Sequence, residues 1–217
     1  EEFGTDWVLL DVELMPWSAK AQDLLRRQYL PTVSAAESAA NALIEALNGV
    51  DGTVELSELK AKAEVRQLNA NLMGKTIDGY CWDADNIEDY RIAPFHILAS
   101  EGAVNTDKPH TWHMTPVEKL AEGDPIIQAT GWKQINLDNP TQCEAVVGWW
   151  LDHTSKGGEG LVFKPTDFLV LGEKGMIQPA MKVRGRDYLR IIYGPDYDLP
   201  ENIERLRQRG LGRKFSL

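Results

Sequence analysis

Two neighbouring stretches of the sequence indicate the fold and the site: residues 157–165, GGEGLVFKP, and residues 178–185, QPAMKVRG. Each stretch predicts a short β-strand. Because successive side chains of a strand point to opposite faces, Lys182 and Arg184 project together and Val183 faces the other way. Glu159 opens the first strand directly after two glycines, whose lack of a Cβ lets a backbone or a ligand approach closely.

These charges together predict a site for a triphosphate and a metal ion. A carboxylate at the mouth of a strand suits Mg²⁺, a hard cation that prefers oxygen ligands and often shares phosphate oxygens with a nucleotide. For either strand alone, the simpler interpretation is an amphipathic strand with solvated charges. The combination of Glu159 with Lys182 and Arg184 favours the site.

Composition excludes several classes of protein. The chain has 217 residues, of which 43% are hydrophobic and 26% are charged, and this suits one globular core with room for an inserted module. No apolar run approaches the ~20 residues of a membrane helix and no signal peptide is evident, so we expect a cytoplasmic protein without membrane contact. Cys81 and Cys143 form no CxxC pattern, so neither a disulfide framework nor a zinc site is expected. His110 and His113 lack the rest of a metal motif and are interpreted as surface or structural residues.

Charge is distributed unevenly along the chain. The formal net charge of −10 argues against a protein that coats nucleic acid by bulk attraction. Residues 182–214 nevertheless carry nine Lys or Arg against five Asp or Glu. The C-terminal end is therefore a candidate anion-binding surface, and a solvated helix face is an equally good interpretation.

The chain begins with a predicted strand and continues into a helical block. The strand, residues 6–14, places Asp11 and Glu13 on one face, a pair that suits a ribose, a metal or a basic partner, or plain solvent exposure. Residues 18–74 follow as three expected helices with narrow, alanine-rich apolar stripes, which predict an inserted module with a modest core of its own. The first helix is expected to start at Ser18 and to stop at Pro31. The second is expected to start at a capping box at 34–37 and to end in a left-handed conformation at Asn48-Gly49. The third is expected to start after Thr53 and to end at Gly74.

The strand at residues 91–99, RIAPFHILA, contains a proline and is therefore expected to be an edge strand or a bulged strand. Such a break can aim Phe95 or His96 into a pocket, where a ring can stack on a base, although a core phenylalanine is the more common outcome. The remaining expected elements are a helix from Thr115-Pro116, a strand at 132–137, a helix from Asn139-Pro140 with Trp149 and Trp150 in the core, a strand through 189–193 and a helix from Pro200.

These motifs resemble those of the covalent nucleotidyltransferase superfamily of ATP-dependent ligases and capping enzymes. Residues 11–14, 159–164 and 182–184 are similar to its third, fourth and fifth motifs. More narrowly, the sequence resembles the ligase domain of bacterial polynucleotide kinase-phosphatase, and this resemblance covers most of the chain. Its clearest stretches are residues 13–22, 93–98 and 185–197, together with the helical insert after the third motif.

The resemblance implies an α+β fold in which an antiparallel-sheet nucleotidyltransferase core, like that of ATP-dependent ligases, carries a helical insert module. On this basis residues 1–17 and 75–195 form the core, residues 18–74 form the insert, and residues 196–217 begin a C-terminal helical region. The implied activity is RNA end joining in bacterial RNA repair, with ATP and Mg²⁺ or Mn²⁺. AMP passes from ATP to a lysine, then to the RNA 5′-phosphate, and leaves when the 3′-hydroxyl attacks.

The resemblance also implies roles for particular residues and partners. Glu159 would hold the metal, Lys182 and Arg184 would contact the nucleotide phosphates, Glu13 would serve the ribose or a metal-bound water, and Phe95 would stack on adenine. Preorganised cations of this kind stabilise the charge that spreads over phosphoryl oxygens in the transition state. The implied partners are RNA, the kinase and phosphatase modules of the same enzyme, and a methyltransferase that modifies the 2′-hydroxyl of the RNA 3′-terminal ribose.

The nucleophilic lysine of the superfamily belongs to a first motif, upstream of the third. Lys20 and Lys75 lack the surroundings of that motif, so we expect an upstream segment to supply the lysine in cis or in trans, and the isolated chain not to label itself with AMP. Two other functions remain open at this point. One is a non-catalytic scaffold that docks RNA or the methyltransferase, and the other is a guanylyltransferase of the capping type that uses GTP.

Overall fold

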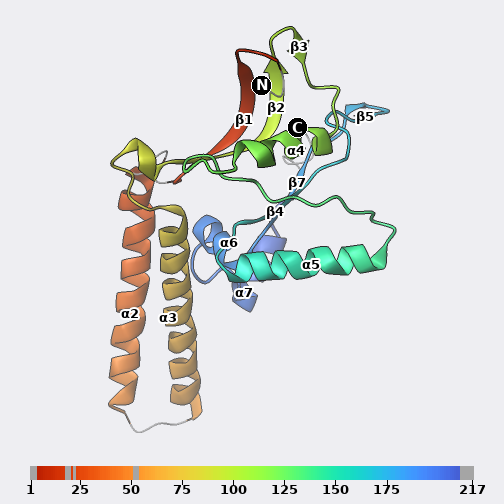
Figure 1. Ribbon diagram of the computed structural model, residues 1–217. Coiled ribbons are helices and arrows are strands. Elements are labelled where there is room, and N and C mark those ends of the chain that lie inside the picture. The colour runs from red at the N-terminus through yellow and green to blue at the C-terminus, as the bar shows by residue number, and fades with distance from the viewer. Residues whose placement is uncertain (1–3, 18–20, 22, 51–53, 211–217) are drawn as a thin grey trace. The chain divides into compact units, whose positions relative to one another are not determined.

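The computed structural model describes residues 4–17, 21, 23–50 and 54–210, and the chain forms two units (Figure 1). The sheet unit comprises Glu1–Gln22 and Tyr80–Gly185, and the helical unit comprises Asp23–Gly79 and Arg186–Leu217. Each is described by itself. The division into core, insert and C-terminal region expected from the sequence stays a prediction. Within the described residues, no helix is both long enough and apolar enough to cross a bilayer.

The larger sheet of the sheet unit is antiparallel, with β1 (Val8–Met15), β2 (Arg91–Ser100) and β3 (Ala103–Val104) in that order (Figure 1). Along β1, Asp11 pairs with His96 and Val12 pairs with Pro94, so Phe95 is left between two partners as an extra residue. The break predicted from Pro94 is therefore confirmed as a β-bulge. Its position gives the ring of Phe95 a direction that regular alternation would not.

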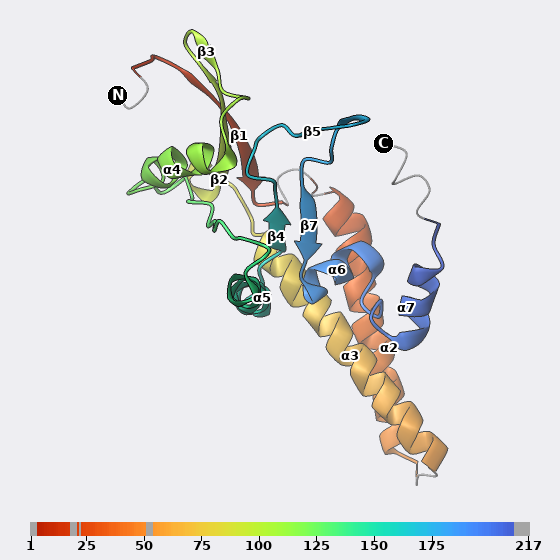
Figure 2. The same cartoon turned by 90° about the vertical axis from the view of Figure 1, so that its right-hand side faces the viewer.

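A second antiparallel pair of strands joins residues 157–165 to residues 178–185. β4 (Gly160–Phe163) and β7 (Met181–Arg184) lie side by side (Figure 2), with Gly160 opposite Arg184. Gly160 has a φ of +137°, and a Cβ there would lie 2.7 Å from the Cα of Arg184 and against the carbonyl oxygen of Val183. Both predicted strands are confirmed, and the glycine is needed because the strands approach closely. A short hairpin, β5 (Leu171–Gly172) and β6 (Gly175–Met176), lies between them in sequence.

Helices α4 (His110–Leu120) and α5 (Pro140–Ser155) complete the sheet unit, with a short 3₁₀ turn, η2, at Ile87–Asp89. α5 begins where predicted, because the Asn139 side chain accepts hydrogen bonds from the backbone N–H groups of Thr141 and Gln142. The indole N–H of Trp150 donates to the carbonyl of Val183 at 3.0 Å and ties α5 to β7.

Two predictions in this region are wrong. The helix expected from Pro116 begins six residues earlier, at His110, because residues beyond the local motif decide its start: the His110 N–H donates to the Thr166 carbonyl at 2.9 Å. Pro116 consequently lies inside α4. Residues 132–137 form no strand, since no described strand lies alongside to satisfy their backbone groups.

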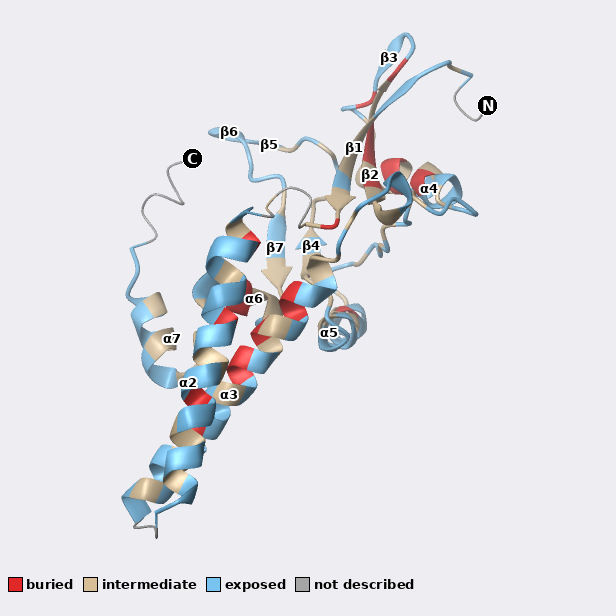
Figure 3. Cartoon of the chain, turned by 90° about the vertical axis from the view of Figure 1, so that its left-hand side faces the viewer, coloured by how far each residue is buried: buried red, intermediate tan, exposed pale blue. Residues whose placement is uncertain are grey.

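The helical unit contains a helical hairpin. A π-helical turn, η1 (Leu25–Tyr29), runs into α2 (Leu30–Asn48), and α3 (Val54–Tyr80) returns alongside it. The amide of Gln67 donates to the side-chain oxygen of Asn41 across the two helices. Buried residues recur along both helices (Figure 3) and include Ala40, Ala63 and Ala70. The alanine-rich face expected for α2 is confirmed at Ala40. The face expected for α3, formed by Ala61, Val65, Leu68 and Leu72, is wrong: Val65 and Leu68 are 44% and 56% exposed, and α3 buries Ala63, Ala70, Met73 and Ile77 instead.

Several predicted helix limits in the hairpin are wrong. Pro31 does not stop a helix but lies in the first turn of α2, where a missing N–H is tolerated, and the predicted capping box at 34–37 falls inside that helix. Gly74 does not end α3, because it serves close packing: a Cβ there would lie 3.3 Å from a methyl group of Val33. α2 does end at Asn48, although Gly49 has a φ of −86° and is not left-handed. The expected start at Ser18 lies outside the described residues.

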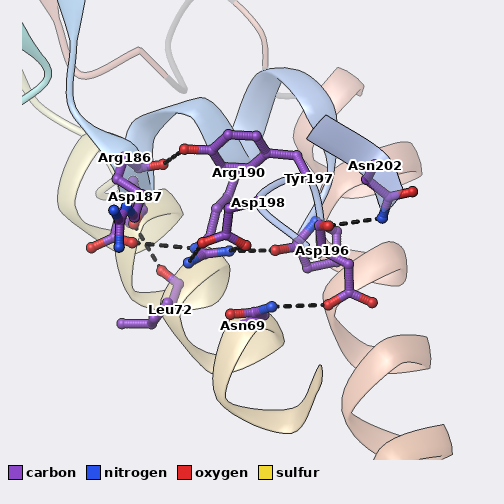
Figure 4. Close-up of polar contacts among 11 residues, drawn as sticks. Asn69, Leu72, Arg186, Asp187, Arg190, Asp196, Tyr197, Asp198 and Asn202 are labelled. Atoms are coloured by element: carbon purple, nitrogen blue, oxygen red, sulfur yellow. Dashed lines mark hydrogen bonds and ion pairs between the residues drawn. The ribbon is translucent and has the colours of Figure 1, made fainter. Parts of the chain in front are cut away.

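The C-terminal part of the helical unit consists of α6 (Arg186–Tyr193) and α7 (Pro200–Arg207). The strand predicted through 189–193 is wrong. Arg190 is buried and contacts Asp187, three residues earlier, at 3.2 Å, a spacing that only a helix brings together. Its guanidinium also binds both carboxylate oxygens of Asp198, at 2.9 and 2.8 Å (Figure 4). The helix predicted from Pro200 is confirmed.

Candidate functional site

Of the three residues predicted as catalytic, Glu159 directly precedes β4, and Lys182 and Arg184 lie on β7. The guanidinium of Arg184 forms an ion pair with the carboxylate of Glu159, and the Gly185 N–H donates to the Glu159 carbonyl at 2.7 Å. Lys182 projects two residues before Arg184 and is exposed. The pairing of the two strands therefore places the Glu159 carboxylate beside Arg184, on the strand that also carries Lys182.

The donor chemistry of Glu159 fits a magnesium or manganese ion that is shared with a nucleotide. Its side chain is 44% exposed, so carboxylate oxygen remains open to solvent beside the Arg184 ion pair. Among the residues the structure describes, no three His, Cys, Asp or Glu side chains are grouped to hold a metal ion. Mg²⁺ is often held by one or two carboxylates together with phosphate oxygens and water, so a single carboxylate suits this kind of site.

A chain of polar contacts that the sequence did not predict leads away from the end of β4. Lys164 Nζ lies 3.0 Å from His96 Nε2, and His96 Nδ1 lies 3.2 Å from Asp11 Oδ2. An ammonium group can only donate, so Nε2 accepts and the ring proton resides on Nδ1, where it donates to Asp11. His96 thus connects a cation to a carboxylate as a neutral ring.

The environment of this chain lowers the pKa of both its bases. Burial lowers the pKa of His96, and the charge of Lys164 adds to that effect and outweighs the opposing hydrogen bond and charge of Asp11. Burial likewise lowers the pKa of Lys164, with Lys182 acting in the same direction and Asp11 in the opposite one. The charge of Lys182 thus disfavours the charged form of Lys164, and an anion bound near both would favour it.

Phe95 belongs to the same group of residues. Lys164 Nζ lies 4.8 Å from the centre of the Phe95 ring, a cation–π contact, and the His96 ring meets the Phe95 ring edge-on at 5.0 Å. Glu13 lies exposed on β1, opposite Ala93 and two residues beyond Asp11. The structure therefore connects Phe95 to the basic strands through Lys164. The roles assigned to Glu13, Phe95 and the strand residues stay predictions.

Two further histidines pack behind His96. His113 is fully buried, and its Nδ1 accepts a hydrogen bond from the Ile97 N–H at 3.1 Å, which joins α4 to β2. The ring of His110 lies 5.2 Å from His96 and 5.4 Å from Phe168. Burial, together with the positive charges near it, lowers the pKa of His110 to about 4. These contacts agree with the structural role that the sequence suggested as one interpretation.

Sequence reasoning missed Lys164 because its partners are distant in the chain. The one local signal is that Lys164 follows Val162 by two residues, so the two share a strand face if the strand continues. The register adds that Val162 lies opposite Lys182. Because Lys164 shares a strand face with Val162, and Val162 lies opposite Lys182, Lys164 becomes a candidate for a third cation of the site.

The comparisons with known proteins concern the family and the fold. The family model described as "PNKP adenylyltransferase domain, ligase domain" matches residues 1–217. No protein with a curated description matches the chain. Among solved structures, a chain of the "Structure of Pnkp1/Rnl/Hen1 complex" is similar, with a TM-score of 0.68 and 18% sequence identity, and the match covers 96% of this chain and 59% of that chain.

This structural likeness confirms the predicted fold class, a mixed α+β fold with antiparallel sheets of the ligase-like nucleotidyltransferase kind. The chain spans 59% of the length of the solved chain that it matches. The family match, in contrast, extends over the whole chain. We conclude that this protein belongs to the family of PNKP adenylyltransferase domains, the ligase domains that the sequence motifs resembled.

Proposed function

We propose that residues 1–217 form the nucleotide-binding part of an ATP-dependent RNA ligase that acts in bacterial RNA repair. Family membership supports a nucleotidyltransferase of the ligase type. The resemblance of residues 185–197 to the ligase domain of bacterial polynucleotide kinase-phosphatase supports RNA as the substrate.

The observation that carries the proposal is the register of β4 and β7. It places Lys182 opposite Val162 and Arg184 opposite Gly160, so that Lys182 lies near Lys164 and Arg184 contacts Glu159. Two cations thus lie on β7, while Lys164 follows β4 and Glu159 precedes it. Phosphoryl transfer depends mainly on positioned positive charge around the phosphate oxygens, and this arrangement supplies it.

In the proposed reaction, a lysine amine attacks the α-phosphorus of ATP, AMP is transferred to the lysine and pyrophosphate leaves. The RNA 5′-phosphate then takes AMP from the lysine, and the RNA 3′-hydroxyl displaces AMP to seal the strand. We place the nucleophilic lysine outside residues 1–217, in cis or in trans. Lys75 lies on α3 in the helical unit and Lys20 is outside the described residues.

The residues of the site take the following proposed roles. Lys182, Arg184 and Lys164 bind and orient the phosphates, and Phe95 offers a ring to adenine. Glu159 would hold Mg²⁺ or Mn²⁺, which neutralises phosphate charge when bound. Glu13 would serve the ribose or a metal-bound water. The proposed partners are RNA, kinase and phosphatase modules, and a methyltransferase that modifies the 2′-hydroxyl of the RNA 3′-terminal ribose; likeness to a chain from a multiprotein complex supports a role beside other proteins.

Lysine adenylylation of the intact protein tests the proposal. Initial rates with labelled ATP are compared for the parent, Glu159→Ala and Lys182→Ala, with Lys174→Ala as control because Lys174 is an exposed lysine in the turn between β5 and β6. Loss of one preorganised contact should lower the rate by roughly 10² to 10³. The adenylylation rate of the control Lys174→Ala should stay within about twofold of the parent rate.

The same assay separates the alternatives. If both site variants lose less than about tenfold, the strands are structural and the chain is better described as a scaffold. If GTP replaces ATP as the preferred donor of the nucleotide, the capping-type activity is correct instead.

A further inference from the structure

A second candidate binding site lies in the helical unit, apart from the residues discussed so far. A cavity of about 370 Å³ lies between the end of α6 with its following turn and α7. Tyr193, Pro195 and Tyr197 line it from the first segment, and Arg205, Leu206 and Arg209 line it from the second. Its volume falls within the range of about 300 to 1,000 Å³ that is typical of small-ligand sites.

The aromatic side of the cavity offers a ring to a ligand. Tyr193 is 42% exposed, and its ring centre lies 6.0 Å from that of Tyr197. The guanidinium of Arg209 lies 6.0 Å from the Tyr193 ring centre. An accessible tyrosine next to an arginine plane is an arrangement on which unstacked nucleobases pack in complexes with single-stranded nucleic acids.

The charges of the cavity favour an anion. Arg205 and Arg209 are exposed, and in the described part of the chain neither forms an ion pair. Asp196 also lines the cavity, but its carboxylate contacts residues other than Arg205 and Arg209. One oxygen accepts a hydrogen bond from Asn69 at 3.1 Å, and the other lies 3.5 Å from Arg66. The two arginines therefore remain available to a phosphate group.

Two residues of the aromatic side, Tyr197 and Pro195, are held in place by contacts of the buried Arg190 and its neighbours. The hydroxyl of Tyr197 donates to the Arg186 carbonyl at 2.9 Å, and the guanidinium of Arg190 lies 5.7 Å from the Tyr197 ring centre (Figure 4). Arg190 also donates to the carbonyl of Pro195. A preformed wall lowers the entropic cost of binding.

We propose that this cavity, the tyrosine–arginine pocket, binds one nucleotide of a single-stranded RNA, with the base on Tyr193 and the adjoining phosphate at Arg205 and Arg209. RNA as the ligand rests on the proposed function. The chemistry that the pocket recognises is a nucleoside phosphate, which a free mononucleotide also carries. The pocket contains no residue of the predicted adenylylation site, so the two are separable by experiment.

Equilibrium binding of the intact protein to a fluorescent single-stranded 12-mer RNA tests the proposal. Tyr193→Ala should weaken binding about 5- to 100-fold, the usual loss when one stacked base is released. Tyr193→Phe keeps the ring and should bind within about twofold of the parent. The double variant Arg205→Ala/Arg209→Ala should also reduce the slope of log K against log salt by about 0.7, since the two arginines neutralise one phosphate and each phosphate on a single strand contributes about 0.7.

Arg207→Ala is the matched control, because Arg207 is on the same helix, is 74% exposed and does not line the cavity. It should change affinity by no more than about twofold. Unfolding is followed by circular dichroism. If Tyr193→Ala fails to fold, the arginine double variant, whose changes are at exposed positions, decides the outcome.

Three results would overturn the proposal. RNA affinity and salt slope equal to the parent in both Tyr193→Ala and the arginine double variant would remove the pocket from RNA binding. If Arg207→Ala loses as much RNA affinity as the pocket variants, the effect comes from general surface charge and not from the pocket. If the pocket variants bind AMP more weakly than the parent but bind RNA equally well, the pocket is a mononucleotide site.

Adenylylation rates distinguish this proposal from the proposed function. The pocket variants should transfer AMP from ATP to lysine at the parent rate, whereas Lys182→Ala should not. If Lys182→Ala is also unimpaired while the pocket variants lose RNA, the proposed function fails and the RNA pocket stands.

Discussion

Replacing Arg190 by methionine should be among the most destabilising single changes in the helical unit. The Arg190 side chain is 3% exposed and contacts the carboxylates of Asp187 and Asp198 and the carbonyl of Pro195. Burial opposes the charge on Arg190, but the hydrogen bonds and charges of Asp198 and then Asp187 outweigh it and raise the pKa of the guanidinium. Arg190 therefore stays charged at every pH at which the protein is folded.

The expected loss follows from what the substitution leaves behind. Breaking a buried ion pair by removing one partner costs about 3–5 kcal/mol, because a charge remains without its partner. The Asp198 side chain is 21% exposed and that of Asp187 is 38% exposed, so water can partly solvate both carboxylates. We therefore expect the lower end of that range, about 3 kcal/mol. Methionine keeps a long unbranched side chain, so little of the loss should come from an empty cavity.

Urea unfolding of the intact protein, followed by circular dichroism, measures this free energy. Arg207→Met is the matched control, since its ion pair with Glu204 is 4.0 Å long and both side chains are mostly exposed, and it should cost less than about 1 kcal/mol. Asp198→Asn added to Arg190→Met should recover part of the stability, because it removes the stranded charge. A cost below about 1 kcal/mol for Arg190→Met, or no recovery in the double variant, would refute the reasoning.

Gly160→Ala should separate β4 from β7 and lower the free energy of unfolding by about 1–3 kcal/mol, because the positive φ and the contact with β7 both exclude a Cβ. Faster hydrogen exchange of the backbone amides in β7 would report the change. Gly148→Ala is the control and should not destabilise the protein, because a Cβ there would meet no atom within 4 Å. A normal exchange rate in Gly160→Ala would contradict the role given to this glycine. The second prediction concerns pH. Burial lowers the pKa of His110 to about 4, below its ordinary value of 6.5, so the unfolded chain binds more protons between these values and stability falls as pH drops from about 6.5 to about 4. Lowering this pKa from 6.5 to about 4 corresponds to at most about 3.4 kcal/mol, and to about 1–2 kcal/mol after solvent screening of a partly buried ring. His110→Phe should remove that share of the difference between unfolding free energies at pH 7 and pH 4.5; an unchanged difference would show that other groups cause it.

Several features of the site depend on local pattern and were predictable. The period of two places Lys182 and Arg184 on one strand face whatever the partner strand is. A proline within residues 91–99 prevents a regular ladder, and the bulge at Phe95 follows. The family motifs are also contiguous in sequence, which is why the fold class was identified before any coordinates.

Local signals failed where contacts distant in the chain outweighed them. Pro31 and Gly74 are helix breakers by propensity, yet α2 includes one in its first turn and α3 passes through the other, where a glycine lets the helices approach. The mostly apolar residues at 189–193 suggested that the strand ending at Arg184 continues. Arg190 made the segment helical, because its partner Asp187 is within reach only at a helical spacing and Asp198 anchors it from eight residues further on.

The sequence by itself determined the two strands, the shared face of Lys182 and Arg184 and the resemblance to the family, because each depends on residues that are adjacent or alternate along the chain. The tertiary structure paired the two strands and brought Glu159 to Arg184. Only the tertiary structure decided that Lys164 joins them. Its partner His96 is 68 residues away and Asp11 lies 85 residues from His96, and no periodicity extends over such separations. The tyrosine–arginine pocket has the same origin, since Asp196 is engaged only because Asn69 and Arg66, on a different helix, lie beside it.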